Sequence, residues 1–145
     1  MKVLIATDGS EFSRAAIEKT CRVFELTADS EIRVVCVYPP VVPIDAFPQS
    51  LEYSEQLENK ERVDSEAIAA AAVALLKERV PAVTKVETLV KSGAPDQIVL
   101  DTAKEWPADV IVVGSHGRGF WGRLTIGSIS DSIVHHASCS VLVVK

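Results

Sequence analysis

Short runs of apolar, mostly β-branched residues recur along the chain and alternate with longer segments in which apolar residues return every three or four positions. The short runs predict strands at 3–6, 31–38, 83–90, 109–113 and 141–144. The longer segments predict helices near 12–26, 50–79, 96–105 and 127–137. Helices that join successive strands imply right-handed crossovers and a parallel sheet covered on both faces. We therefore expect an α/β fold with a doubly wound parallel sheet of five strands.

Turn-forming residues mark where these elements end. The first strand is closed by Thr7-Asp8-Gly9-Ser10, in which Ser10 is a suitable N-cap for the next helix. Pro39-Pro40 ends the second strand because proline has no backbone N–H to donate, and residues 41–49 read as irregular. Ser92-Gly93-Ala94-Pro95 predicts a turn between the third strand and the third helix.

The long helix and the last helix each have a predicted core-facing stripe. In the long helix the stripe is Ile68, Ala71, Leu75 and Leu76, while its early part is acidic and reads as a solvated face. In the last helix the stripe is Ile129, Ile133, Val134 and Ala137. His135 and His136 close that helix, where a cation complements the helix dipole, and we expect no metal site there.

Composition narrows the class of protein. At 145 residues we expect one domain, spanning 1–145, and a formal charge of −5 without a basic tract argues against nucleic-acid or anionic-membrane surfaces. No apolar run approaches bilayer length, and the apolar start is too short for a secretion signal. The isolated Cys21, Cys36 and Cys139 read as buried free thiols in a reducing compartment. We therefore expect a cytoplasmic protein.

The segment from Gly114 to Ser128 is rich in glycine and carries Arg118, Arg123 and His116 but no acidic residue. It follows a strand and leads into a helix that starts near Gly127. Free N–H groups and the positive dipole end at a helix start favour an anion, and glycines let the backbone approach it closely. The segment therefore predicts a phosphate site.

A second feature points to the same place. Ligands of doubly wound sheets collect at the carboxyl ends of the strands where the strand order reverses. If the first and fourth strands are neighbours, Thr7-Asp8 and Gly114 lie side by side at that crevice.

Three common phosphate or phosphoacceptor motifs do not fit. The literal G-x-G-x-x-G at 117–122 does not lead directly into a helix, and no acidic residue for a ribose follows about twenty residues later. Arg123-Leu124 stands where a Walker loop needs Lys-Ser or Lys-Thr. A receiver domain would need an acidic pair after the first strand and an aspartate after the third, and the chain offers only Asp8.

The spacing Gly114, two residues, Gly117, nine residues, Gly127-Ser128 resembles the nucleotide-binding motif of the universal stress protein family. Further segments resemble the family over the whole chain: Asp8-Gly9-Ser10, Gly93-Ala94-Pro95 with Ile98, Ala108-Asp109, Gly114 to Gly119, Gly127 to Ser130 and Ala137 to Val144. One position departs from the family, because Ser140 stands where proline is usual.

The resemblance implies a fold like that of the adenine nucleotide alpha hydrolases, with strand order 3-2-1-4-5. It further implies a regulatory, usually dimeric module that binds ATP or another adenine nucleotide, with magnesium as a companion ion. By resemblance, Thr7 and Asp8 would contact the nucleoside, with Asp8 near the ribose, and Val37 would lie against the adenine. The positions that the resemblance places along the phosphates are Gly114, His116, Gly117, Arg118, Gly127, Ser128, Ile129 and Ser130.

Other readings stay open from the residues alone. Asp8 could cap the first helix, and Gly127-Ser128 could be only a helix start. The same site could support a slow ATPase or phosphotransferase, although the loop offers no general base, so we name no catalytic residue. The chain could also be an interaction protein that binds no nucleotide.

In the expected strand order the last strand lies at the edge of the sheet. Residues 141–144 are wholly apolar and lack the charge or proline that protects an exposed edge. Antiparallel pairing with the same strand of a second chain would satisfy its backbone groups. We therefore expect a homodimer through Val141, Leu142, Val143 and Val144, with the Ser140 N–H available to extend the pairing.

Overall fold

The computed structural model describes residues 1–43, 47–117 and 126–145. In chain order the elements are β1 (Lys2–Ala6), α1 (Glu11–Val23), β2 (Glu31–Tyr38), α2 (Pro48–Arg79), β3 (Lys85–Ser92), α3 (Pro95–Glu105), β4 (Val110–Gly114), α4 (Ser128–His136) and β5 (Ser140–Val144). The strands form one parallel sheet in the order β3-β2-β1-β4-β5. The predicted doubly wound α/β fold is therefore confirmed.

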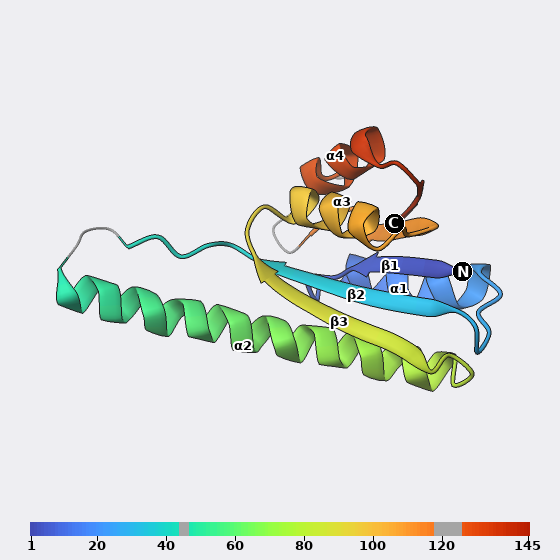
Figure 1. Ribbon diagram of the computed structural model, residues 1–145, viewed down its shortest axis with the longest axis horizontal. Coiled ribbons are helices and arrows are strands. Elements are labelled where there is room, and N and C mark those ends of the chain that lie inside the picture. The colour runs from blue at the N-terminus through green and yellow to red at the C-terminus, as the bar shows by residue number, and fades with distance from the viewer. Residues whose placement is uncertain (44–46, 118–125) are drawn as a thin grey trace.

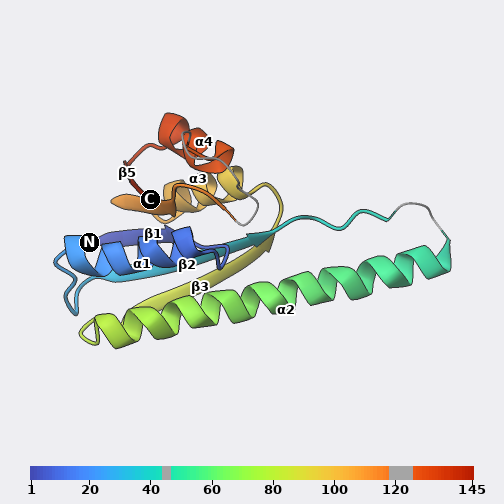
Figure 2. The same ribbon diagram turned by 180° about the vertical axis from the view of Figure 1, so that it is seen from behind.

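Helices cover both faces of the sheet. In Figure 1, α3 and α4 lie on one side of the strands and α2 lies on the other. The view from behind shows α1 on the same side as α2, and these two helices are in contact (Figure 2). Side chains of β1 alternate between the two cores, since Val3 and Ile5 pack with α1 and α2 while Leu4 packs with α3 and α4. The strand is thus buried on both faces, as its continuous apolar run predicts.

The N-cap of α1 is as expected, because the Ser10 Oγ accepts a hydrogen bond of 3.2 Å from the Ser13 N–H. The helix ends at Val23, three residues before the predicted end, so Leu26 lies outside it. Thr20 faces the core, and its hydroxyl donates to the Ala16 carbonyl at 2.8 Å. This bond satisfies a polar group that would otherwise be costly to bury.

The predicted stripe of α2 is partly wrong. The row buried against the rest of the fold is Ser54, Ser65, Ala69, Ala72 and Leu76. Of the predicted residues only Leu76 belongs to it, whereas Ile68 and Leu75 are half-buried and Ala71 is exposed. The apolar arc of α2 is wider than its contact with the sheet, and small residues at 69 and 72 let the helix approach closely. Apolar spacing alone therefore selected residues beside the buried row and not the buried row itself.

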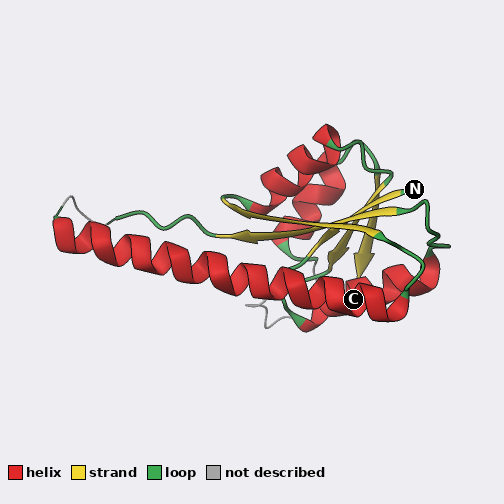
Figure 3. Ribbon diagram, turned by 60° about the horizontal axis from the view of Figure 1, so that its bottom comes forward, coloured by secondary structure: helices red, strands yellow, loops and turns green. Residues whose placement is uncertain are grey.

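The two ends of α2 follow simple rules. The helix begins at Pro48, not Ser50, because proline is favoured at the first helical position. Its N-terminal part runs past the end of the sheet (Figure 3). The early glutamates Glu52, Glu55 and Glu58 are exposed, as predicted for a solvated face.

The stripe of α4 also differs from the prediction. Ile133 and Ser130 are buried, but Ile129 and Val134 are 43% and 45% exposed. The helix α4 has only nine residues and packs against α3 and β5, so it buries few of its side chains. Ile129 in its first turn lines a pocket at the carboxyl ends of the strands. The third strand is shifted as well, since Val83 closes a turn by donating its N–H to the Val80 carbonyl.

The remaining sequence expectations concern thiols and membranes. Cys21, Cys36 and Cys139 form no disulfide. Cys36 is buried as predicted, whereas Cys21 and Cys139 are only partly buried, and this burial raises the pKa of their thiols. Within the described residues, no helix combines the length and apolar character needed to cross a bilayer.

Candidate functional site

A pocket of about 100 Å³ lies at the carboxyl ends of β1, β2 and β4, where the strand order reverses. Its floor is apolar, built by Val35, Val37, Val99 and Val113. Its rim is polar and comes from the segments that follow β1 and β4 and from the first turn of α4. This is the crevice in which doubly wound sheets bind their ligands.

Most of the predicted site residues meet at this pocket. Those that line it are Thr7, Asp8, Val37, Gly114, His116, Gly117, Ile129 and Ser130. Gly127 and Ser128 lie at the start of α4, and Gly127 donates its N–H to the Ser115 carbonyl at 2.8 Å, next to His116. Arg118 lies outside the described residues.

One oxygen of the Asp8 carboxylate is tied to the turn after β1. Its Oδ1 accepts a hydrogen bond of 3.0 Å from the Ser10 N–H, and Gly9 adopts a left-handed φ of 78°. The Thr7 hydroxyl donates to the Ser13 Oγ at 3.1 Å, which ties the end of β1 to α1. Because Ser10 caps α1, the alternative role of Asp8 as helix cap is not the one seen. Asp8 instead closes the turn and borders the pocket.

Two glycines let their neighbours approach closely, for different reasons. A Cβ on Gly114 would lie 2.7 Å from the Phe12 carbonyl carbon, so this glycine lets β4 pass under α1. A Cβ on Gly117 would lie 2.9 Å from the Asp8 Oδ2. Gly117 therefore makes room for a movable carboxylate at the pocket rim, whereas Gly114 makes room for backbone.

The start of α4 presents backbone donors to the pocket. The first hydrogen bond of the helix runs from the Asp131 N–H to the Gly127 carbonyl, so the preceding amides of residues 128–130 have no acceptor within the helix. The Ser130 hydroxyl donates to the Gly114 carbonyl at 2.7 Å and thereby anchors α4 to β4. Its proton is already used, and an anion would find the amides and the helix dipole instead.

His116 has a fixed orientation at the rim. Its Nδ1 lies 3.0 Å from the Ser115 Oγ, and its ring is tilted by 57° against the Phe12 ring at a centroid distance of 5.2 Å. The imidazole is thus held by a hydroxyl on one side and an aromatic face on the other, and it borders the pocket beside Gly117.

Six residues that line the pocket were not among the predicted site residues: Ala6, Ser13, Val35, Pro95, Val99 and Val113. A signal for Pro95 and Val99 was present, because they open a helix directly after the carboxyl end of β3. Ser13 carried no such signal, since its place depends on how the first turn of α1 folds back onto β1.

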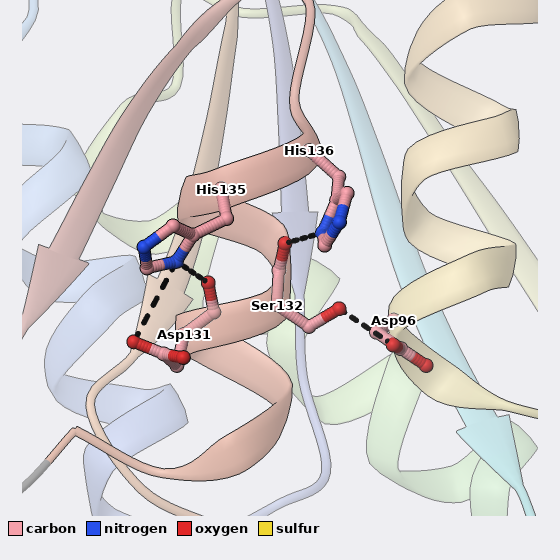
Figure 4. Close-up of polar contacts among 5 residues, drawn as sticks. All are labelled: Asp96, Asp131, Ser132, His135 and His136. Atoms are coloured by element: carbon pink, nitrogen blue, oxygen red, sulfur yellow. Dashed lines mark hydrogen bonds and ion pairs between the residues drawn. The ribbon is translucent and has the colours of Figure 1, made fainter.

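One polar contact joins α4 to α3 beside the site, and others lie within α4 (Figure 4). The Ser132 hydroxyl donates to the Asp96 Oδ2 at 2.7 Å, and this bond lowers the pKa of the Asp96 carboxyl. The Nδ1 atoms of His135 and His136 lie 2.9 Å and 2.8 Å from the carbonyls of Asp131 and Ser132 in the same helix. Both imidazoles thus contact backbone carbonyls one turn earlier in α4. Among the described residues, no cluster of three metal-binding side chains occurs.

Comparison with known proteins gives relatives of the same length. A universal stress protein from Thermus aquaticus, named for its position in the QAH/OAS sulfhydrylase 3′ region, is 33% identical over 147 residues, covering 99% of this chain and 97% of the relative. The structure of the hypothetical protein MJ0577 aligns with a TM-score of 0.83 at 23% identity, covering 99% of this chain and 94% of that one. This likeness shows the same fold.

Two further structures of the same fold hold nucleotides. A universal stress protein in complex with cAMP aligns with a TM-score of 0.60 at 23% identity, covering 100% of this chain and 97% of that one. A universal stress protein family protein from Arabidopsis thaliana with AMP bound aligns with a TM-score of 0.65 at 22% identity, covering 100% and 91%. The family model described as "Universal stress protein family" matches residues 1–145. The chain therefore belongs to the universal stress protein family.

Proposed function

We propose that this protein is a cytoplasmic regulatory module of the stress response that binds ATP or another adenine nucleotide. The observation that carries the proposal is the convergence of the predicted residues from β1, β2, β4 and α4 on one pocket. The relatives with cAMP and AMP bound support an adenine nucleotide as the ligand.

Each part of the pocket suits one part of a nucleotide. The apolar floor around Val37 would take the adenine base, and the Asp8 carboxylate would accept hydrogen bonds from the ribose hydroxyls. The amides at the start of α4 would bind phosphate oxygens, helped by the dipole of the helix. A magnesium ion would accompany the phosphates of ATP. The phosphates would extend from the pocket along its rim toward the start of α4.

Binding is favoured over turnover. Among the described residues that line the pocket, the one carboxylate is that of Asp8, and a hydrogen bond to the Ser10 N–H already holds it. A hydrolase would need a group that positions or activates the attacking water. We therefore expect less than about one ATP hydrolysed per minute, far below the median enzyme rate of about 10 per second.

We further propose a homodimer that forms through β5. This strand is the edge of the sheet beyond β4, and its residues Val141, Leu142 and Val143 are half-buried. Beside it lies a mostly apolar hollow of about 400 Å³, to which Met1 and Val23 contribute, and these two residues are 43% and 52% exposed. An unpaired apolar edge next to an apolar hollow supports pairing with a second chain.

Calorimetric titration with ATP, AMP, cAMP and GTP, each with and without magnesium, tests the nucleotide proposal. We expect adenine nucleotides to bind and GTP to bind at least about tenfold more weakly, a difference of about 1.4 kcal/mol. The Asp8→Ala variant should lose the affinity that depends on the ribose.

The matched control is Asp101→Ala, which removes an exposed carboxylate of α3 away from the pocket. It should bind like the parent. If no adenine nucleotide gives a binding signal, or if Asp8→Ala and Asp101→Ala bind equally well, the proposed site is wrong.

A further inference from the structure

A second and larger cavity of about 640 Å³ lies between α1 and α2, on the face of the sheet opposite to α3 and α4. Ile17 of α1 forms one wall, and Ile68 and Leu75 of α2 form the other. Cavities that hold small molecules commonly have volumes of about 300–1,000 Å³ with mostly apolar walls. This cavity falls in that range, and the nucleotide proposal does not use it.

The cavity exists because the apolar arc of α2 is wider than the sheet requires. Ala69 and Ala72 face the core, while Ile68 and Leu75 on the flank of the arc turn toward α1. The wall on the side of α2 also contains four alanines, of which Ala67, Ala71 and Ala74 are exposed. Methyl side chains at these positions leave the space that larger side chains would fill. Ile68, Ala71 and Leu75 of the predicted stripe thus form part of the wall of this cavity.

Charges stand at the two ends of the cavity. Both helices return antiparallel to the strands and so run in the same direction, which places Arg14 toward the Ala67 end and Glu78 at the other end. The Arg14 side chain is 70% exposed, and its ion pair with Glu18 is long at 3.8 Å. Such an exposed pair contributes little stability, so the guanidinium can turn to a ligand at low cost.

On the side of the cavity next to the nucleotide pocket, the hydroxyl protons of Thr7 and Ser13 are already donated within the fold. There the Thr7 hydroxyl donates to the Ser13 Oγ at 3.1 Å, and the Ser13 hydroxyl donates to the Ser10 carbonyl at 3.0 Å. A ligand would gain little from polar atoms placed against this surface. Its body should therefore be apolar, with its polar group near Arg14.

We propose that the cavity between α1 and α2 is a second ligand site, and that it binds a small amphiphile with an apolar body and one anionic head group. The apolar body would lie along Ile17, Ile68 and Leu75 and bury apolar surface against them. The anionic head, a carboxylate or sulfonate, would pair with the Arg14 guanidinium. Glu78, whose carboxylate lies 3.8 Å from the Arg79 guanidinium, stands at the far end of the cavity, so the anionic head group is expected at the Arg14 end.

Binding of decanoate, measured by titration calorimetry with the whole chain, tests the proposal. We expect saturable binding to the parent protein with one site per chain. Ala71→Leu places a larger side chain in the cavity and should weaken the binding at least about tenfold. Ala67→Leu fills the same cavity from the preceding turn of α2 and should weaken the binding in the same way. It serves as the test variant if Ala71→Leu folds poorly.

Ala70→Leu is the matched control, because Ala70 is an exposed alanine of the same helix that does not line the cavity. It should bind decanoate like the parent. Arg14→Gln should weaken the binding of decanoate while leaving the binding of uncharged decanol unchanged, since decanol has no anion for Arg14 to pair with.

Absence of saturable decanoate binding would overturn the proposal, and so would equal binding by Ala71→Leu and Ala70→Leu. The oligomeric state of the parent, Ala71→Leu and Ala70→Leu is measured in parallel by light scattering. If Ala71→Leu alone changes the oligomeric state and decanoate does not bind, the cavity between α1 and α2 is a protein interface and not a ligand site.

Discussion

The glycines around the nucleotide pocket show how much the effect of one residue depends on what its missing side chain faces. A Cβ on Gly114 would meet the backbone of Phe12, which cannot move without shifting α1. A Cβ on Gly117 would meet the Asp8 carboxylate, which can rotate away. Gly127 has an ordinary φ of −62°, so its backbone angles do not require glycine. Its role is one of space, since a Cβ would lie 3.2 Å from the Ser115 carbonyl oxygen.

We predict that Gly114→Ala mainly lowers stability, whereas Gly117→Ala mainly weakens nucleotide binding. Gly114→Ala should lower the free energy of unfolding by about 1–3 kcal/mol, because the clash is with fixed backbone in a packed interior. Gly117→Ala should keep the stability of the parent but weaken nucleotide binding, because it displaces the Asp8 carboxylate from the pocket rim. Urea unfolding and calorimetric titration of both variants make the comparison. If Gly117→Ala is the less stable protein, this account of the two glycines is wrong.

At the scale of elements, β5 forms one edge of the sheet. It pairs with β4 along its whole length, from Ser140 opposite Val110 to Val144 opposite Gly114. Its other side is the edge of the sheet. Natural proteins usually protect such an edge with charge, proline or cover, and the apolar residues 141–144 provide none of these themselves.

The substitution Val143→Lys should therefore convert the proposed dimer to monomers. The charge would be buried if two β5 strands paired, which costs far more than the pairing of this one residue gains. Multi-angle light scattering gives the mass of each species. Val143→Thr is the control, because it keeps the β-branched shape without a charge and should remain dimeric. If Val143→Lys and Val143→Pro both remain dimeric, the interface lies elsewhere.

At the scale of the molecule, the sequence was a good guide to topology and a poorer one to the faces of helices. Strand order and pocket position could be inferred because buried parallel strands are continuous apolar runs and because their carboxyl ends meet at one edge. The face of α2 could not, because its apolar arc spans both the sheet and α1, and spacing does not say which part faces which. Ser13 could not be foreseen either, since it reaches the pocket through the fold of the turn at 7–10.

That turn joins the two cavities. Thr7 and Ser13 line both the nucleotide pocket and the cavity between α1 and α2, and a hydrogen bond of 3.1 Å connects their hydroxyls. A ligand in either place would pack against this pair and restrict its motion. The second ligand would then lose less conformational entropy on binding, which gives positive cooperativity without a change of shape.

If both proposed ligands bind, we predict that saturating decanoate increases the affinity for AMP by a factor of about five, within the usual range of coupling between sites. Thermodynamic linkage requires that AMP increase the affinity for decanoate by the same factor. Titrating each ligand in the presence and absence of the other measures both factors. Ser13→Ala breaks the hydrogen bond between the hydroxyls and should bring both factors close to one, while each ligand still binds alone. Two ligands that bind the parent with full independence would show that the shared pair at Thr7 and Ser13 transmits nothing between the cavities.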